Sequence, residues 1–363
     1  MTAPYHKVYE ACTFGFCANT DENGLEADFV YLENADDINM KQANGKIVML
    51  NNYMSRTMLE KLVKAGALGF VSFSGTPIDT GKKRLPASKN LSQSKTLAEI
   101  PGTCIHFVDA AEIVEKGALR VRMICEQTLV EKTSQNICAR IEGSDKSDDI
   151  LTVTAHYDSV PQGPGAYDNM AGCAIVMELF LYFCEHKPRR TIDFVFFGAE
   201  ETGMHGSKEY VNSLTKKEKD NIVLMINIDS ILAGDNLYLY GGRINDKGVV
   251  KDVEAVNKAF EIAKKANLPM QLTPKGNVDY PYPTGQKRSD HAPFSDIGIP
   301  YIYFEANNWL NGLPVETENH GLIMHSDKDD LSFIENEYGN RAKDTMANYS
   351  HLLHLVLQEN NWE

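Results

Sequence analysis

The chain has 363 residues, of which 43% are hydrophobic and 24% are charged, and its net charge is −14 at pH 7. Such a composition predicts a globular protein with room for two domains. A strongly acidic chain lacks the basic surface that nucleic acid requires, so we expect no nucleic-acid partner.

Cysteine usage and the N-terminal residues give expectations about compartment. The seven cysteines form no CxxC pair, which favours reduced, mostly buried thiols over a thiolate metal cluster. The first twenty residues lack a basic stretch followed by an apolar one, and no apolar run has the length of a membrane span. We therefore expect a cytoplasmic protein from the chain as given, or a secreted one if a leader was trimmed, and no membrane partner.

The first part of the chain predicts a small α/β domain, which we place at 1–130. GKIVMLNN (45–52) predicts a strand, SRTMLEKLVKAG (55–66) a helix and ALGFVSFSG (67–75) a second strand. A further strand contains His106, which we interpret as a packed residue because no cluster with metal-ligand spacing surrounds it in the sequence.

The remainder, 131–363, alternates apolar strands with helices. This alternation predicts an α/β fold with a mostly parallel central sheet sandwiched by helices. The predicted strands are 148–158, 191–201, 221–231, 236–242 and 299–306, and the predicted helices are 169–186, 206–214, 247–268 and 336–358. In such sheets, ligands bind at the carboxyl ends of the strands.

Acids and histidines stand where these strands end. His156 and Asp158 follow LTVTA, Glu200 and Glu201 follow FVFFGA, and Asp229 follows LMINI. Each alone has a simpler interpretation, such as a turn residue or a solvated surface group. Together they predict one cluster at one edge of the sheet.

Two loops add Asp168, in GPGAYDNMAG, and His325, in LIMHSDKDDL. Carboxylates gathered without Lys or Arg are destabilising, and a metal centre removes that cost. Two imidazoles with three carboxylates suit zinc, or manganese or cobalt, better than calcium or magnesium. Five ligands exceed one tetrahedral zinc but suffice for two if one carboxylate bridges. Asp158 is better placed to orient His156 than to bind metal.

Five sequence blocks then resemble the di-zinc aminopeptidase family, whose relatives include glutamate carboxypeptidase II, glutaminyl cyclases and the transferrin receptor. The resemblance covers about 135–358. The blocks are AHYDSVPQGPGAYDNMAG, FFGAEETGMHGSKEYV, INIDSI, SDHAPF and MHSDKDDL. The upstream domain resembles a protease-associated domain through its strand–helix–strand pattern and the phrase AGALGFV.

The resemblance implies specific roles for these residues. It implies a cis peptide bond between Asp168 and Asn169 and a general base at Glu200. The implied ligands of two zinc ions are His156 and Asp229 for one, Glu201 and His325 for the other, and Asp168 as the bridge.

The implied activity is hydrolysis of the N-terminal bond of a peptide with a free N-terminus. In this hypothesis, two zinc ions activate a water, Glu200 carries its proton to the leaving amine, and Asp158 assists. Asp290 and His291, in SDHAPF, either line the substrate pocket or are structural, with Asp290 capping a short helix and His291 packed beneath the site. The oligomeric state stays open.

Three alternatives remain at this point. A carboxypeptidase or dipeptidase would need cations for a free carboxylate, and Arg243, Lys287 and Arg288 are available. A glutaminyl cyclase would need one zinc and fewer ligands. A non-catalytic, receptor-like module would have lost ligands that this sequence keeps.

Overall fold

The computed structural model divides the chain into two compact units. One comprises Met1–Lys132 with Asn319–Asp327, and the other comprises Thr133–Glu318 with Lys328–Glu363. The structure describes residues 1–51, 54–78, 86, 89–91, 97–145, 147–244, 250–251, 254–272, 288–308, 316–359 and 362. Among these residues, none of the helices combines the length and the apolar character needed to cross a membrane.

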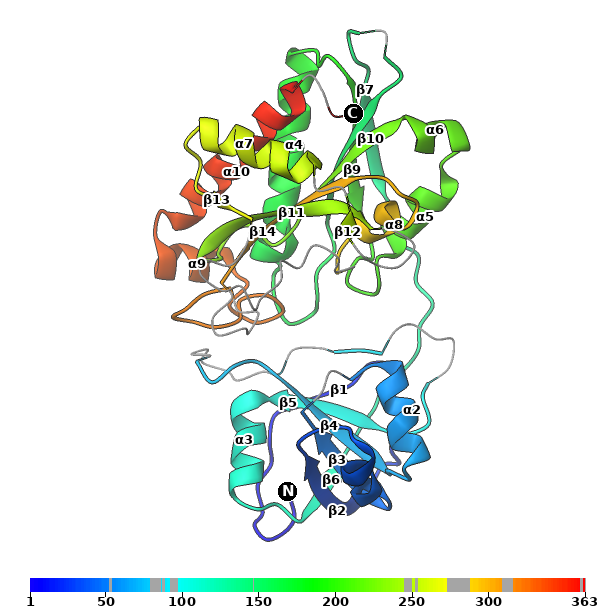
Figure 1. Cartoon of the computed structure of the whole chain (residues 1–363). Coiled ribbons are helices and arrows are strands. Elements are labelled where there is room, and N and C mark those ends of the chain that lie inside the picture. Colours follow the sequence, from blue (N-terminus) through cyan, green and yellow to red (C-terminus); the bar gives the residue numbers. More distant parts are fainter. Residues whose placement is uncertain are drawn as a thin grey trace. The chain divides into compact units, whose positions relative to one another are not determined.

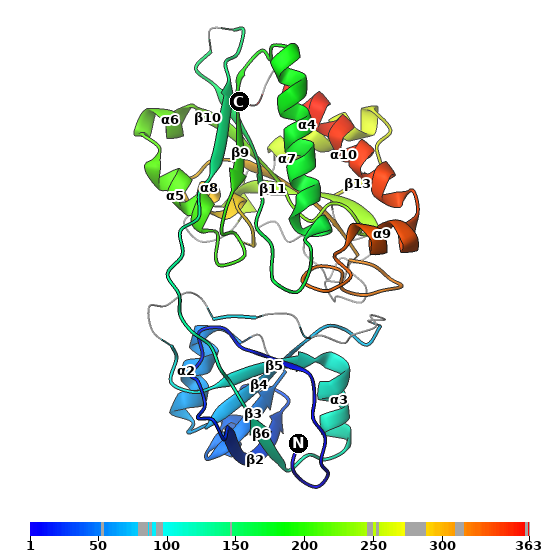
Figure 2. The same ribbon diagram turned by 180° about the vertical axis from the view of Figure 1, so that it is seen from behind.

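The first unit is built on a six-stranded sheet (Figures 1 and 2). Its strands in spatial order are β1 (Ala11–Thr13), β5 (Gly102–His106), β4 (Gly69–Ser74), β3 (Lys46–Leu50), β2 (Leu25–Leu32) and β6 (Arg120–Met123). The four central strands are parallel, and β1 and β6 pair antiparallel at the two edges. The predicted strands at 45–52 and 67–75 are confirmed as β3 and β4.

Helices cover both faces of this sheet. They are α1 (Asp37–Met40), the 3-10 turn η1 (Lys41–Ala43), α2 (Arg56–Lys64) and α3 (Phe107–Glu115). Side chains alternate along a strand, so Val48 and Leu50 of β3 pack in the core under α2, whereas Ile47 and Met49 pack in the core under α3. His106 is buried and accepts a hydrogen bond from the backbone N–H of Val108, which caps α3.

The second unit is an α/β layer structure, as the sequence predicts. Its strands in spatial order are β12 (Val250–Lys251), β11 (Asn236–Ile244), β14 (Tyr301–Asn307), β10 (Ile222–Ile228), β8 (Ile150–His156), β9 (Thr191–Phe197) and β7 (Ile137–Ile141), with β13 (Met270–Gln271) beside β11. The central strands β14, β10, β8 and β9 are parallel, while β11 and β7 join them antiparallel. Every residue of β8 is buried, which is typical of a parallel sheet covered on both faces.

Helices lie on both faces of this second sheet. Figures 1 and 2 show α4, α7 and α10 on one face and α5, α6 and α8 on the other. The helices of this unit are α4 (Ala171–Glu185), α5 (His205–Ser213), α6 (Lys216–Asn221), α7 (Glu254–Lys265), α8 (His291–Asp296), α9 (Leu331–Tyr338) and α10 (Arg341–Gln358). The turn η2 (Ala166–Met170) directly precedes α4.

Two predicted helices differ from the structure. The helix predicted at 247–268 corresponds to α7 (Glu254–Lys265), and Val250–Lys251, predicted as helical, form strand β12 instead. The closing helix predicted at 336–358 is two helices, α9 and α10. Gly339, with φ of 58°, separates them, since glycine adopts this conformation readily and ends the first helix.

Candidate metal centre

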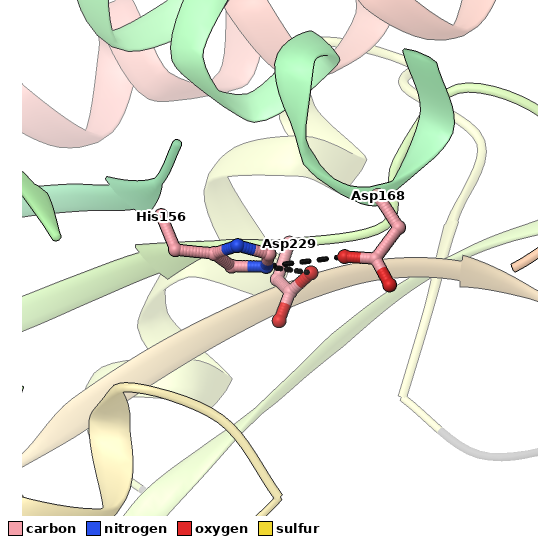
Figure 3. Close-up of side chains that lie close together, drawn as sticks. All are labelled: His156, Asp168 and Asp229. Carbon is pink, nitrogen blue, oxygen red and sulfur yellow. Dashed lines mark ion pairs between the residues drawn. The ribbon is translucent and has the colours of Figure 1, made fainter. Parts of the chain in front are cut away.

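Three side chains meet at the carboxyl edge of the second sheet (Figure 3). His156 ends β8, Asp229 follows β10, and Asp168 lies in the turn before α4. The Nε2 atom of His156 is 3.1 Å from Oδ1 of Asp168 and 3.4 Å from Oδ1 of Asp229. All three residues are buried, and their ligand atoms lie within 4.8 Å of one another.

Asp168 also belongs to a second group of three. Its ligand atom lies within 4.8 Å of those of Glu201 and His325. His325 adopts a positive φ of 58°, a conformation that non-glycine residues rarely hold and that is often found at functional sites. The five residues that the sequence suggested as ligands therefore form two groups that share one carboxylate.

The electrostatics of His156 show that a cation fits here. Burial lowers the pKa of His156, but the carboxylates of Asp229 and Asp168 outweigh burial and raise that pKa well above its ordinary value. The carboxylates thus favour a positive charge between them. Imidazole nitrogen and carboxylate oxygen are the donors that zinc takes in proteins, so the residues present fit this metal.

Asp158 connects the end of β8 with the turn that follows β9. Its backbone carbonyl lies 3.0 Å from Nδ1 of His156, whereas its carboxylate Oδ1 is 3.7 Å from that nitrogen. A carbonyl only accepts, so Nδ1 donates its proton and Nε2 is left to face the cluster. The carboxylate instead accepts from the backbone N–H groups of Glu200 at 3.0 Å and Glu201 at 3.2 Å. Orientation of His156 by Asp158 therefore runs through the carbonyl.

Glu200 and Glu201 follow a sharp turn at the end of β9. Ala199 has a positive φ of 59°, and the carbonyl of Glu200 accepts from the N–H groups of Gly203 and Met204 at 2.7 Å each. Burial raises the pKa of Glu200 well above its ordinary value; His156 opposes this shift, and the carboxylates around it, Asp290 among them, add to it. A carboxyl group with a raised pKa can hold and release a proton near neutrality.

Comparisons with known proteins show the family of this chain. Residues 136–350 match the model of peptidase family M28. Aminopeptidase YwaD of Bacillus subtilis is 30% identical over 342 residues, which cover 91% of this chain and 67% of that protein. This chain belongs to peptidase family M28.

Solved structures show the same fold. The zinc aminopeptidase BSAP from Bacillus subtilis matches 97% of this M28 chain and 80% of its own, with a TM-score of 0.66 and 22% identity. A peptidase M28 precursor from Shewanella amazonensis matches 99% of this chain and 80% of its own, with a TM-score of 0.68 and 20% identity. An aminopeptidase of Pseudomonas aeruginosa is 24% identical over 78% of this chain, which spans only 50% of that relative.

A chain of buried hydrogen bonds supports Asp229 in the M28 unit. Ser289 Oγ donates to Oδ2 of Asp229 at 2.5 Å, and Asn227 Nδ2 donates to Ser289 Oγ at 2.8 Å. Thr154 Oγ1 in turn donates to Oδ1 of Asn227 at 2.9 Å. Sequence reasoning missed this chain. Its signal is the presence of polar residues, Thr154 and Asn227, at buried positions of two strands that are mostly apolar.

Asp168 is held by its backbone. The backbone N–H groups of Tyr167 and Asp168 donate to the carboxylate of Asp329 at 2.5 Å and 3.2 Å. The peptide bond between Asp168 and Asn169 is cis, as the resemblance implied, and Asn169 Nδ2 donates to the carbonyl of Ile228 at 2.8 Å. Asp329 was not singled out from the sequence, although it lies in the block MHSDKDDL.

The two residues of the SDHAPF block differ in environment. Asp290 precedes α8 but makes no capping hydrogen bond with its side chain, so the capping interpretation is wrong. It is fully buried, and burial raises its pKa to about 7. His291 stacks on Tyr301 and lies against Tyr303, with ring centroids 4.5 Å and 4.8 Å apart, as the packing interpretation expected.

Of the three cationic side chains that could bind the free carboxylate of a carboxypeptidase substrate, the structure describes only that of Arg288. Nη2 of Arg288 lies 3.7 Å from Oε2 of the buried Glu305. Lys287 and the side chain of Arg243 lie outside the described residues.

Proposed function

We propose that this M28 chain is a zinc-dependent aminopeptidase that hydrolyses the N-terminal peptide bond of its substrate. The observation that carries the proposal is the pair of ligand groups sharing Asp168, beside a partly buried Glu200 that is not a member of either group. The relatives named aminopeptidase, and the similarity in fold to a zinc aminopeptidase, support the same activity.

The five clustered residues would hold two zinc ions. His156 and Asp229 would hold one, Glu201 and His325 the other, and Asp168 both. Bound zinc supplies Lewis acidity, which lowers the pKa of water and polarises the scissile carbonyl.

Glu200 would move the proton in this reaction. Its carboxylate would take a proton from the attacking water and deliver it to the nitrogen of the leaving amine. The backbone N–H groups of Glu200 and Glu201 both donate to the carboxylate of Asp158, which holds the turn that carries the two glutamates and so supports these separate roles. Asp158 would thus be a positioning residue.

The direct test compares leucine p-nitroanilide with its N-acetyl derivative on enzyme reconstituted with zinc. An aminopeptidase recognises the free α-amino group, so the unblocked anilide should be hydrolysed and the acetylated one should not. Equal hydrolysis of both compounds, or hydrolysis of only C-terminally free dipeptides, would reject the aminopeptidase assignment.

A further inference from the structure

The turn η2, which carries Asp168, is held by a residue that lies 161 positions further along the chain. Three successive backbone N–H groups of this turn donate to Asp329. That of Tyr167 donates to Oδ1 at 2.5 Å, that of Asp168 to Oδ2 at 3.2 Å, and that of Ala166 to the backbone carbonyl at 3.4 Å. Each carboxylate oxygen of Asp329 therefore accepts from one N–H group of the turn.

These hydrogen bonds are shielded from water. Asp329 is 1% exposed, Tyr167 is 0% exposed and Asp168 is 4% exposed. Bulk water does not reach such positions, so an N–H group that lost its acceptor there would stay unsatisfied, which is costly inside a protein. The buried carboxylate needs donors for the same reason. The conformation of the turn and the position of Asp329 therefore depend on each other.

The side chains of the turn reach the ends of two strands. The hydroxyl of Tyr167 donates to the carbonyl of Ala306 in β14, and Asn169 Nδ2 donates to the carbonyl of Ile228 in β10 at 2.8 Å. These bonds fix the residues on either side of Asp168, and Asp329 adds the bond to the backbone of Asp168 itself. From the turn so held, the side chain of Asp168 points toward His156 (Figure 3).

Asp168 is the residue that the two groups of candidate metal ligands share. A displacement of its backbone would move its carboxylate relative to both groups at once. Ser289 differs in this respect, because it donates to Asp229, which belongs to one group only. A residue that orients Asp168 should therefore affect both metal positions, whereas a residue that orients Asp229 should affect one.

We propose that Asp329 is a positioning residue for the shared ligand. Its carboxylate holds the backbone of Asp168 where one side chain serves both ligand groups, so that Asp329 controls the affinity of both metal positions together. This inference rests on the two-zinc site of the proposed function, but it concerns the binding of the metal and not the peptide bond that is cleaved.

Zinc titration of the metal-stripped protein, in competition with a chelator, tests the proposal without measuring activity. Asp329→Asn keeps the size of the side chain, but its amide NH₂ replaces one of the two acceptor oxygens. Loss of an outer hydrogen bond of this kind weakens metal binding about 10–100-fold, and here both zinc equivalents should weaken by at least about tenfold. Ser289→Ala should weaken only one equivalent. An Asp329→Asn protein that binds both equivalents as the wild type does, or that weakens only one, would overturn the proposal.

The neighbouring Asp330 offers a matched control. Its carboxylate accepts from the backbone N–H of Phe333 at 3.0 Å and caps α9. Asparagine caps helices about as well as aspartate, so Asp330→Asn makes the same chemical change and should bind zinc as the wild type does. Equal weakening in the two variants would refute a specific role for Asp329.

Two further outcomes are separable. If Asp329→Asn does not fold, as judged by circular dichroism of the metal-free protein, Asp329→Glu takes its place. It keeps both acceptor oxygens on a longer side chain, displaces the turn and should weaken both equivalents. A wild-type protein that binds a single zinc would contradict the proposed function. The role of Asp329 would then be judged on that one equivalent, which Asp329→Asn should still weaken because Asp168 belongs to either group.

Discussion

At the residue scale, adjacent glutamates have separate surroundings. Glu201 shares a group of ligand atoms with Asp168 and His325, whereas Glu200 lies outside both groups and has a raised pKa. Both backbone N–H groups are fixed by Asp158. Their side chains can therefore perform different tasks from neighbouring positions.

Substitution of Glu200 tests this separation. Glu200→Gln should lower kcat by about 10²–10⁴-fold, because a proton carrier is lost, and the zinc content should stay at the wild-type value. The matched variant Glu201→Gln should instead lose zinc. Metal content by mass spectrometry, measured beside turnover, distinguishes the two. A Glu200→Gln enzyme that keeps its metal and most of its turnover would remove Glu200 from the reaction.

Ser289 should act through Asp229. Its hydroxyl donates to the carboxylate of Asp229 at 2.5 Å, and loss of such outer hydrogen bonds weakens metal binding about 10–100-fold. Ser289→Ala should therefore weaken zinc binding by about that factor in competition with a chelator. Ser295→Ala, at a buried serine of α8, is the control and should bind zinc as the wild type does. Equal affinities for the two variants would show that Ser289 does not position Asp229.

Much of the site is predictable from the sequence. The rest is not, because it depends on which atoms of a residue make a contact and on which distant segments meet in the fold. The ends of parallel strands share one edge, so His156 and Asp229 are expected to meet once their strands are recognised. The sequence does not show which atoms of Asp158 are used, because carbonyl and carboxylate come from the same residue. The Thr154–Asn227–Ser289 chain depends on which face each side chain takes and on a loop distant in sequence.

At the element scale, long apolar strands and helices follow from their periodicity, but short or interrupted ones do not. β12 and β13 have two residues each, too few to show a pattern. β7 carries mostly exposed residues and lies in KTSQNICARIEGSDKSDD (132–149), a segment that is polar around one short apolar patch. It is held at the edge of the sheet by its pairing with β9 and by an ion pair.

That ion pair predicts a stability effect. Arg140 of β7 contacts Asp193 of β9 through two bonds, Nε to Oδ1 at 2.6 Å and Nη2 to Oδ2 at 2.8 Å. The Asp193 side chain is 8% exposed and that of Arg140 is 41% exposed, so solvent screens part of the interaction. Arg140→Gln should lower the free energy of unfolding by about 1 kcal/mol.

Chemical denaturation measures this effect against a control. Lys217→Gln removes one partner of an exposed pair, Lys217 with Asp148, whose side chains are 74% and 73% exposed. Such pairs contribute little, so this variant should match the wild type. A loss no greater in Arg140→Gln than in Lys217→Gln would mean that the ion pair does not stabilise the edge strand.

At the scale of the whole molecule, the family match and the candidate metal centre involve the same part of the chain. The M28 match runs over 136–350 and contains all five candidate ligands. The upstream unit, with its six-stranded sheet, lies almost wholly outside that match. Its resemblance to a protease-associated domain stays a prediction.

The most direct test of the central claim is a zinc titration of metal-stripped enzyme, with hydrolysis of leucine p-nitroanilide followed at each addition. Two ligand groups joined by Asp168 predict that two zinc ions bind per chain and that turnover reaches its maximum only at the second equivalent. Turnover that is complete at one equivalent, or that persists in the stripped enzyme, would contradict a two-zinc aminopeptidase.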